Sequence, residues 1–256
     1  MKIGVTGCAG RMGKMLCQAV IEAGLELSGG TERPESPVIG QELGKGKVFA
    51  DIKELFAVSD AVLDFTAPAA SVANAKVAAE TGKVLVIGTT GLTEAQRAEV
   101  AKAAEKAPIV LAPNMSVGVN LLQALVEKVA SILDPAYDIE IVEMHHRNKV
   151  DAPSGTALAL GKAAAKGRGE SLDKVACYER HGVIGARPAG EIGFATLRGG
   201  DVVGDHTVIF AGTDERIELT HKASSRAVFA NGAVRAALWA AGQKAGLYSM
   251  RDVLGF

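Results

Sequence analysis

The chain begins with a strand-like run that leads directly into a glycine-rich turn and then into a helical pattern. Residues 2–6 contain three β-branched residues, and Gly7, Gly10 and Gly13 follow them at once. Glycine lets a backbone approach a pyrophosphate closely, and a helix start offers free N–H groups and a partial positive charge. Glycines at this spacing also form ordinary turns between strands and helices. Their place after a strand and before a helix favours a dinucleotide-binding turn.

Short apolar runs alternate with Ala-rich helical patterns through the first half of the chain. We predict strands at residues 2–6, 25–30, 61–65, 84–87 and 109–112, and helices at residues 14–23, 71–80 and 94–106. The polar, Gly- and Pro-containing stretch at residues 33–47 is interpreted as a surface loop. Alternation of this kind is typical of right-handed βαβ units, and it predicts an α/β fold with a Rossmann-like doubly wound parallel sheet.

The pattern changes after Pro113. Ser116 is a candidate cap for a long amphipathic helix that ends at Asp134-Pro135. A strand at residues 137–144, a helix at 154–165 and three strand-like runs at 193–198, 202–210 and 216–221 follow. These runs predict a second, α+β domain with a mixed or antiparallel sheet. A final helix at residues 232–245 could pack back on the first domain, so we predict domains at 1–116 with 226–256, and at 117–225.

Composition and charge narrow the class of protein. The 256 residues are 48% hydrophobic with a net charge of −1, so nothing favours a nucleic-acid or anionic-membrane partner. No apolar run approaches the roughly 20 residues that span a bilayer, and the N-terminus lacks a signal-peptide layout. The three cysteines match neither a disulfide scaffold nor a zinc knuckle. We expect a soluble cytoplasmic protein with reduced thiols.

The cofactor expectation extends beyond the glycine turn to three more strand ends. Glu32 lies where a ribose-binding carboxylate should fall, and its neighbour Arg33 suits a 2′-phosphate, so both NADH and NADPH stay open. Ligands of such sheets bind beyond the carboxyl ends of strands, where two further loops lie. The predicted NADH- or NADPH-binding residues are Gly7, Cys8, Ala9, Gly10, Arg11, Met12, Glu32, Arg33, Gly88, Thr89, Thr90, Ala112, Pro113, Asn114 and Met115.

A second cluster, residues 143–156, is called the cationic segment below. A hydrophobic strand runs into two histidines, one arginine and one lysine, and then into a Pro-Ser-Gly-Thr helix start. The N–H groups of a helix start can bind a carboxylate, while lysine and histidine supply charge and protons. A Pro-Ser-Gly-Thr sequence is also a plain helix start, and adjacent histidines on a strand point to opposite faces. Neither HExxH nor a cysteine pair accompanies them, so we predict no metal site.

The string Glu143-x-His145-His146-x-x-Lys149-x-Asp151-Ala152-Pro153-Ser154-Gly155-Thr156-Ala157 resembles the signature of the 4-hydroxy-tetrahydrodipicolinate (dihydrodipicolinate) reductase family. Further matching segments extend over nearly the whole chain: Gly7–Gly13, Asp64-Phe65-Thr66, Gly88–Gly91, Asn114, Ser116–Asn120, Ile192–Phe194, Gly204-x-His206-Thr207 and His221–Arg226. Met115 departs from the resemblance, because an aromatic residue is expected there in many relatives.

The resemblance implies an NAD(P)H-dependent oxidoreductase that reduces 4-hydroxy-tetrahydrodipicolinate, a small dicarboxylate, to tetrahydrodipicolinate in lysine and diaminopimelate biosynthesis. Hydride would come from the nicotinamide and the proton from His145 or Lys149. His146, Gly155 and Thr156 would bind the substrate carboxylates. The second domain would bind substrate and, through its sheet, form a homotetramer.

Two other classes of protein stay open. One is a two-domain dehydrogenase acting on an aspartate-derived aldehyde, which would usually need a catalytic cysteine. Cys177 has no evident base beside it, which disfavours this alternative. The other is a non-catalytic nucleotide sensor, which would have little need for His145, Lys149 and an anion-binding helix start placed together.

Overall fold

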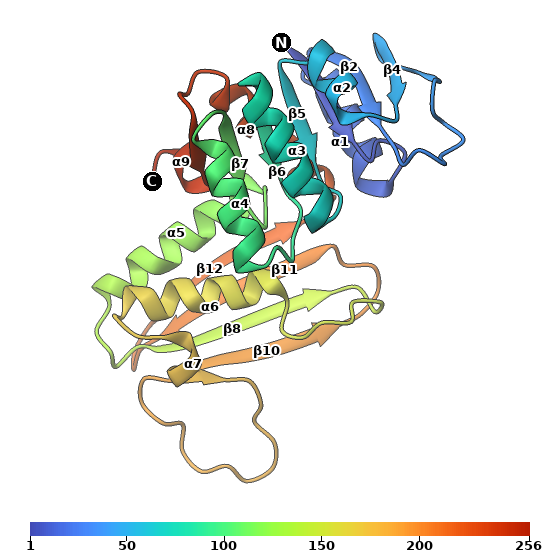
Figure 1. The fold of residues 1–256 in the computed structure, drawn as a ribbon. Coiled ribbons are helices and arrows are strands. Elements are labelled where there is room, and N and C mark those ends of the chain that lie inside the picture. The colour runs from blue at the N-terminus through green and yellow to red at the C-terminus, as the bar shows by residue number, and fades with distance from the viewer. The chain divides into compact units, whose positions relative to one another are not determined.

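A computed structural model describes all of residues 1–256, and the chain separates into two compact units. The first unit comprises Met1–Val117 and Ala227–Phe256, so its sequence is discontinuous, and the second is Gly118–Arg226. Figure 1 shows the fold of each unit. The chain passes from one unit to the other after Val117 and after Arg226, one residue later than the predicted boundaries at 116/117 and 225/226.

The first unit is built on an eight-stranded sheet in the order β13-β7-β6-β5-β1-β2-β4-β3. All neighbouring pairs are parallel except β3 with β4. The central strands are apolar on both faces because helices cover both sides of the sheet. The strands are β1 (Lys2–Thr6), β2 (Glu26–Thr31), β3 (Glu42–Leu43), β4 (Gly46–Phe49), β5 (Ala61–Asp64), β6 (Val84–Ile87), β7 (Pro108–Leu111) and β13 (Gly246–Tyr248).

The helices of this unit, drawn in Figure 1, pack on the sheet and form two hydrophobic cores with it. Their bounds are α1 (Arg11–Glu22), α2 (Ile52–Val58), α3 (Pro68–Thr81), α4 (Glu94–Ala104), α8 (Ala227–Ala240) and α9 (Met250–Leu254). One core joins α1, α8 and α9 to the sheet, and the other joins α2, α3 and α4. The Rossmann-like doubly wound fold is therefore confirmed. No helix of the chain is long and apolar enough to cross a membrane.

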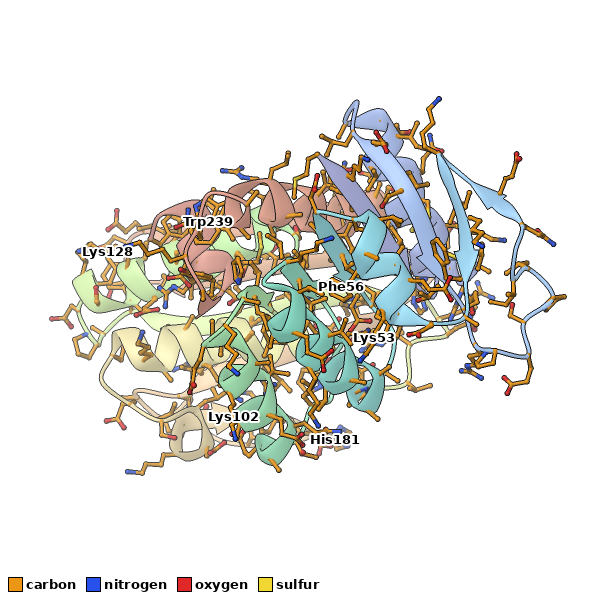
Figure 2. The ribbon with its side chains drawn as sticks, turned by 45° about the horizontal axis from the view of Figure 1, so that its top comes forward. Lys53, Phe56, Lys102, Lys128, His181 and Trp239 are labelled. Carbon is orange, nitrogen blue, oxygen red and sulfur yellow. The ribbon has the colours of Figure 1, made fainter.

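Helix α2, which the sequence did not predict, shows how a short helix is fixed. Asp51 caps it, its Oδ1 accepting a hydrogen bond from the Lys53 N–H at 2.9 Å. Phe56 on the inner face is fully buried in the core, whereas the Lys53 side chain lies outside and pairs with Glu80 at 3.1 Å (Figure 2). Burial of the apolar face stabilises these seven residues far more than the exposed ion pair does.

The prediction of a surface loop at residues 33–47 is wrong from residue 42 onward. Residues 42–49 form the hairpin β3–β4, and β4 extends the sheet beside β2. Gly44 has φ +64°, and a Cβ on Gly46 would lie 1.9 Å from the Ser28 carbonyl oxygen. Two glycines therefore permit the turn and the close approach, in a hairpin too short to show a period-two pattern.

The last long helix also begins earlier than predicted, because Gly232 lies inside it rather than at its start. A Cβ on Gly232 would lie 1.8 Å from the Met115 carbonyl oxygen, so glycine lets α8 pack directly on the backbone after β7. The expectation that this helix returns to the first part of the chain is correct.

The second unit has a five-stranded mixed sheet in the order β12-β11-β8-β10-β9. Its elements are α5 (Val117–Ile132), β8 (Asp138–His145), α6 (Gly155–Gly167), α7 (Leu172–Val175), β9 (Ala176–Cys177), β10 (Ile192–Arg198), β11 (Gly204–Ala211) and β12 (Arg216–Ala223). Helices α5 and α6 pack on one face through apolar residues such as Val126, Ile141 and Leu160. The opposite face carries Val142, Met144 and Leu197, the last 49% exposed.

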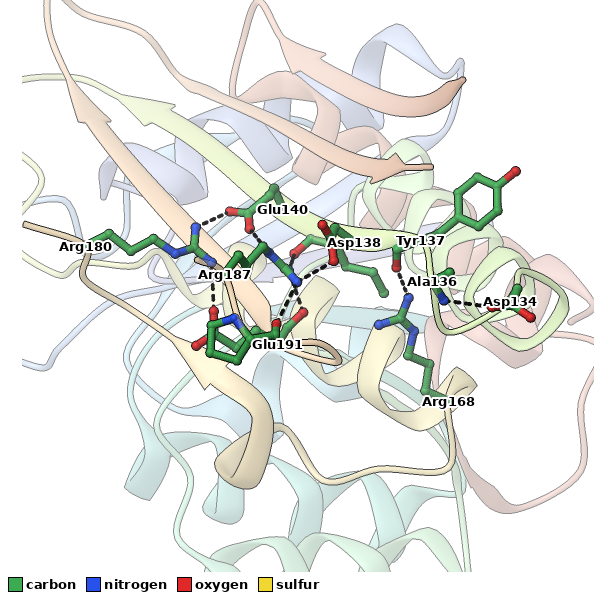
Figure 3. Close-up of polar contacts among 11 residues, drawn as sticks. Asp134, Ala136, Tyr137, Asp138, Glu140, Arg168, Arg180, Arg187 and Glu191 are labelled. Carbon is green, nitrogen blue, oxygen red and sulfur yellow. Dashed lines mark hydrogen bonds and ion pairs between the residues drawn. The ribbon is translucent and has the colours of Figure 1, made fainter. Parts of the chain in front are cut away.

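A long loop connects β9 to β10, and two arginines, Arg180 and Arg187, bind its base to β8 (Figure 3). Arg187 contacts Asp138 Oδ1 at 2.6 Å and Glu140 Oε1 at 3.0 Å, and Arg180 contacts Glu140 Oε2 at 2.8 Å. Arg180 also contacts the Glu191 carboxylate at 3.0 Å. Burial opposes ionisation of Glu140, but the two guanidinium groups outweigh it and lower its pKa.

Replacing Arg187 by Met should open this loop base without unfolding the unit. The substitution removes donors to two carboxylates and to the Ile139 and Glu191 carbonyl oxygens. A local loss of about 1.4 kcal/mol would make cleavage of residues 178–190 by a protease about tenfold faster. Arg216→Met, which loses only an exposed pair with Glu218, is the matched control. Equal cleavage rates in the two variants would contradict this role for Arg187.

Candidate active site

The turn between β1 and α1 has the shape that a pyrophosphate requires. Gly7 has φ +60°, and a Cβ on Gly13 would lie 2.0 Å from the Gly7 carbonyl oxygen, so the turn and the helix are in close contact. Helix α1 begins after Gly10 with no side-chain cap and no acidic residue in its first turn. No side chain of the helix itself therefore occupies its N-terminus, which fits a bound phosphate group.

The structure brings Glu32, at the end of β2, onto this turn. Its Oε1 accepts a hydrogen bond from the Ala9 N–H at 2.9 Å. Arg33 beside it is exposed, and a cavity of about 600 Å³ is lined by both residues together with Gly7 and Gly10. Cys8 is buried, and burial raises its thiol pKa to about 11, so it adds packing rather than charge. The turn residues and the acidic residue of the predicted site are thus neighbours in one unit.

The other predicted cofactor residues lie at the carboxyl ends of β6 and β7, as expected. Thr89 is buried and accepts a hydrogen bond from the Thr66 N–H at 2.9 Å, whereas Thr90 is exposed. Asn114 Oδ1 accepts from the Ser116 N–H at 2.9 Å. Met115 is 1% exposed and belongs to the core, so only its backbone is available to a ligand. Gly88, Ala112 and Pro113 complete these loops.

Asp64, to which the sequence analysis assigned no role, links the carboxyl ends of neighbouring strands in this sheet. Asp64, fully buried at the end of β5, accepts hydrogen bonds from the hydroxyls of Thr6 at 2.8 Å and Thr66 at 2.5 Å. Side chains therefore link the ends of β1, β5 and β6, next to the loops that carry the predicted cofactor residues.

In the second unit the cationic segment lies at the end of β8 and the start of α6. Glu143 and His145 point to the same face of β8 because side chains on a strand repeat every two residues. They meet directly, with Glu143 Oε2 and His145 Nδ1 2.5 Å apart. His145 is 8% exposed, and His146, just beyond the strand, is half-buried.

Glu143 is the centre of this cluster. It is 1% exposed, and both its oxygens contact Arg198, at 2.8 and 3.0 Å, while Oε1 also accepts from the Ser154 N–H at 3.0 Å. Burial opposes its ionisation, but Arg198, His145 and the Ser154 N–H outweigh burial and lower its pKa. A buried carboxylate without these donors would cost about 3–5 kcal/mol, so the cluster depends on all of them.

A third histidine, His206 on β11, completes the cluster. His206 Nε2 lies 3.0 Å from Ser154 Oγ, and its ring meets that of His145 edge to face at 5.1 Å. Burial lowers the pKa of His206 to about 4, helped by the nearby His145, so it is neutral at neutral pH. Ser154 Oγ accepts from the Ala157 N–H, which leaves its hydroxyl hydrogen free to donate to His206.

The predicted anion-binding residues begin α6. Ser154 is the N-cap, no acidic residue lies in the first turn, and a Cβ on Gly155 would meet nothing within 4 Å. The helix start is thus open at Gly155, with Thr156 next to it. Lys149 Nζ pairs with Asp151 at 2.9 Å, and its charge, with that of Arg198, adds to burial in lowering the pKa of His145.

The structure brings residues of the predicted segment together with partners that local sequence did not reveal. His145 pairs with Glu143 rather than with Lys149. Arg198 and His206 come from strands 55 and 52 residues away from their partners Glu143 and Ser154. His206 stood in the segments that carried the resemblance, which was a usable signal, whereas Arg198 had none. No group of three or more His, Cys, Asp or Glu side chains is arranged to hold a metal ion.

A phosphate-binding turn on a doubly wound sheet, in a chain that also carries a protonatable cationic cluster, defines a nicotinamide-dependent oxidoreductase. The family models "Dihydrodipicolinate reductase, N-terminus" and "Dihydrodipicolinate reductase, C-terminus" match residues 1–115 and 118–254. The chain belongs to the dihydrodipicolinate reductase family, whose members use NADH or NADPH.

Individual relatives match this chain over its full length. The 4-hydroxy-tetrahydrodipicolinate reductases of Rhodopseudomonas palustris strains BisB18 and BisA53 are 54% and 55% identical, covering 100% of this chain and 97% of each relative. The fold resembles that of a dipicolinate-bound dihydrodipicolinate reductase from Paenisporosarcina sp. TG-14, with a TM-score of 0.81 at 24% identity over 97% of both chains. The predicted family, fold class, enzyme class and cofactor type are confirmed.

Proposed function

We propose that this chain catalyses the NAD(P)H-dependent reduction of 4-hydroxy-tetrahydrodipicolinate to tetrahydrodipicolinate, in lysine and diaminopimelate biosynthesis. The observation that carries the proposal is that one buried carboxylate, Glu143, binds both a protonatable group and an open helix start. Its Oε2 contacts His145, and its Oε1 holds the N-cap residue of α6. A proton donor and an anion site placed together suit a dicarboxylate that must be protonated as it is reduced.

The atoms and electrons that the reaction adds and removes determine which groups the protein must supply. When bound, the reduced nicotinamide supplies a hydride to an unsaturated ring carbon, and one proton must reach the adjacent centre. Starting from the hydroxylated ring, one water also leaves, so the net change is the loss of one oxygen. The protein supplies orientation, charge neutralisation and the proton.

The substrate carboxylates would bind at the start of α6 and beside the cationic side chains. Backbone N–H groups at Gly155 and Thr156 would take one carboxylate, and the helix dipole adds attraction. His146 would contact the substrate from the end of β8. The open space around Gly155, where a Cβ would meet nothing within 4 Å, supports this role because a ligand can reach the helix start.

His145 is the proposed proton donor, with Lys149 as the second candidate. Burial and the charges of Lys149 and Arg198 lower the pKa of His145, so the free protein holds this ring mainly neutral at pH 7. A dianionic substrate beside the ring favours its charged form and raises that pKa. Substrate binding would therefore bring the proton onto His145 at the moment it is needed.

Arg33 is the proposed contact of a 2′-phosphate. Replacing Arg33 by Ala should weaken NADPH about fivefold, equivalent to about 1 kcal/mol, and leave NADH almost unchanged. Titrations of both nucleotides by fluorescence give the two dissociation constants. Arg97→Ala, at an exposed position on α4, is the control. Equal weakening of NADH and NADPH would remove Arg33 from this role.

The assembly is proposed as a homotetramer through the uncovered face of the second sheet. Val142 and Met144 on that face are half-buried and Leu197 is 49% exposed, which supports an interface rather than a solvated face. All three cysteines are free thiols, which fits the proposed cytoplasmic location.

Oxidation of NADPH or NADH in the presence of freshly prepared 4-hydroxy-tetrahydrodipicolinate tests the proposed function. We expect turnover with this heterocycle and none with an aspartate-derived aldehyde. Turnover of the aldehyde alone would favour the other dehydrogenase class, and nucleotide binding without any turnover would favour a sensor.

A further inference from the structure

We propose that Glu143 is the positioning residue of the reaction: it fixes His145 in the tautomer whose Nε2 faces the substrate, and it ties this proton donor to the substrate-binding helix start. The inference rests on the proposed function, and it adds a role for a residue that does not itself touch the reacting atoms.

The tautomer follows from the contact between Glu143 and His145. An ionised carboxylate only accepts hydrogen bonds, so His145 Nδ1, 2.5 Å from Glu143 Oε2, must carry a hydrogen. The proton that His145 exchanges is then the one on Nε2. A Cβ on Gly204 would lie 2.9 Å from that Nε2, so the missing side chain leaves room for the ring in this orientation.

The charges around His145 give Glu143 a second effect. Arg198 on β10, Lys149 in the loop after β8 and the neutral His206 on β11 surround the ring, and Glu143 is the anion in contact with it. Burial, Lys149 and Arg198 lower the pKa of His145, while Glu143 raises it. Without the carboxylate, the imidazolium would face two cations and no anion, and the protonated donor would be scarce at neutral pH.

The same carboxylate holds the helix start. Glu143 Oε1 accepts from the Ser154 N–H at 3.0 Å, and Arg198 Nη2, which contacts Glu143, also donates to the Asp151 carbonyl oxygen at 2.6 Å. His206 secures Ser154 from the other side through its hydroxyl. A displacement of Glu143 would therefore move the proton donor and the anion site together.

Replacing Glu143 by Gln keeps the shape and inverts the hydrogen bonding. Arg198 Nη2 and the Ser154 N–H donate to Oε1, so the amide oxygen remains there. The amide N–H group then takes the place of Oε2, where it faces His145 and loses the hydrogen bond from Arg198 Nη1. Nδ1 becomes an acceptor, which makes Nε2–H the neutral tautomer and disfavours the imidazolium. We expect the pKa of His145 to fall and kcat at neutral pH to drop about 10²-fold or more.

The test is ¹⁵N NMR of histidine-labelled protein over a pH titration, with the pH dependence of kcat beside it. The wild type should show His145 with Nδ1 protonated, and Glu143→Gln should show Nε2 protonated at unchanged NADPH affinity. The control is Glu140→Gln, which removes another arginine-bound carboxylate from the opposite face of β8 and should leave the His145 tautomer as in the wild type. An unchanged tautomer and pH profile in Glu143→Gln would overturn the proposal.

A second variant keeps the test decisive if Glu143→Gln does not fold. Lys149→Met removes a cation that lowers the pKa of His145 without removing a donor to Glu143, so the pKa should rise while Nδ1 stays protonated. A fall in this pKa, or loss of the tautomer, would contradict the role of Glu143. The NMR readout needs no substrate, so an inactive wild-type protein would refute the proposed function and leave the positioning test intact.

Discussion

Replacing His145 by Gln and Lys149 by Ala in one chain should lower kcat by about 10⁴-fold while NADPH binds as in the wild type. Both candidate proton donors are then gone, and neither Gln nor Ala can supply a proton near neutral pH. The nucleotide turn lies in the other unit and does not depend on either side chain. Steady-state kinetics give kcat, and a fluorescence titration gives the NADPH dissociation constant.

The matched control carries the same two substitutions at exposed positions, His181→Gln and Lys162→Ala. It should turn over at the wild-type rate, which separates loss of the proton donors from loss of two basic residues. Normal kcat in the His145/Lys149 variant would contradict the assignment of both. A shared loss of kcat and NADPH affinity would point instead to unfolding.

Gly13→Ala should abolish most nucleotide binding. The new Cβ would lie 2.0 Å from the Gly7 carbonyl oxygen and 2.7 Å from the Cys8 Cα, which are backbone atoms that cannot swing aside. Either the turn opens or α1 shifts, and both move the N–H groups away from a pyrophosphate. Strain of about 3 kcal/mol corresponds to roughly 10²-fold weaker binding of NADH and NADPH alike.

Gly242→Ala is the control for that substitution, since its Cβ would meet only the Trp239 carbonyl oxygen at 3.7 Å. Isothermal titration calorimetry with both variants measures the effect, and circular dichroism checks that each is folded. Wild-type nucleotide affinity in a folded Gly13→Ala protein would exclude the turn between β1 and α1 as the phosphate site.

The first unit could be predicted well because its signals are local. Buried parallel strands are short apolar runs, and glycine-rich turns and amphipathic helices between them complete the pattern. The errors fall where the pattern is too short to read: the hairpin at residues 42–49 has a two-residue strand, and α2 spans only seven residues. The Asp51 cap was visible in the sequence but had no long periodic stretch after it.

The second unit shows the limit of local reasoning more clearly. His145, Lys149 and the α6 start were found because they lie within one short segment. Arg198 was missed because its place depends on register: it lies opposite His145 in the pairing of β10 with β8. His206 lies opposite Glu143 in the pairing of β11 with β8. Strand register is set by the whole sheet, so one sequence does not reveal which distant residues meet.

The same dependence on register explains why no role could be assigned from the sequence to Glu143, which is only the first residue of the cationic segment. In sequence it is an acidic residue in an apolar strand. In the structure it is a buried carboxylate that contacts His145 on its own strand and receives hydrogen bonds from Arg198 on β10 and from the N-cap of α6. Its role as a positioning residue could therefore be inferred only when the distances were known.

Isotope transfer tests the central claim, that a nicotinamide hydride and a separate proton reduce the ring. The enzyme is incubated with 4-hydroxy-tetrahydrodipicolinate and NADPH carrying deuterium at the transferable position of C4, and the product is analysed by mass spectrometry. We predict one deuterium per tetrahydrodipicolinate from the cofactor, and one from solvent when unlabelled NADPH is used in D₂O. A product without deuterium from the labelled cofactor would contradict the account.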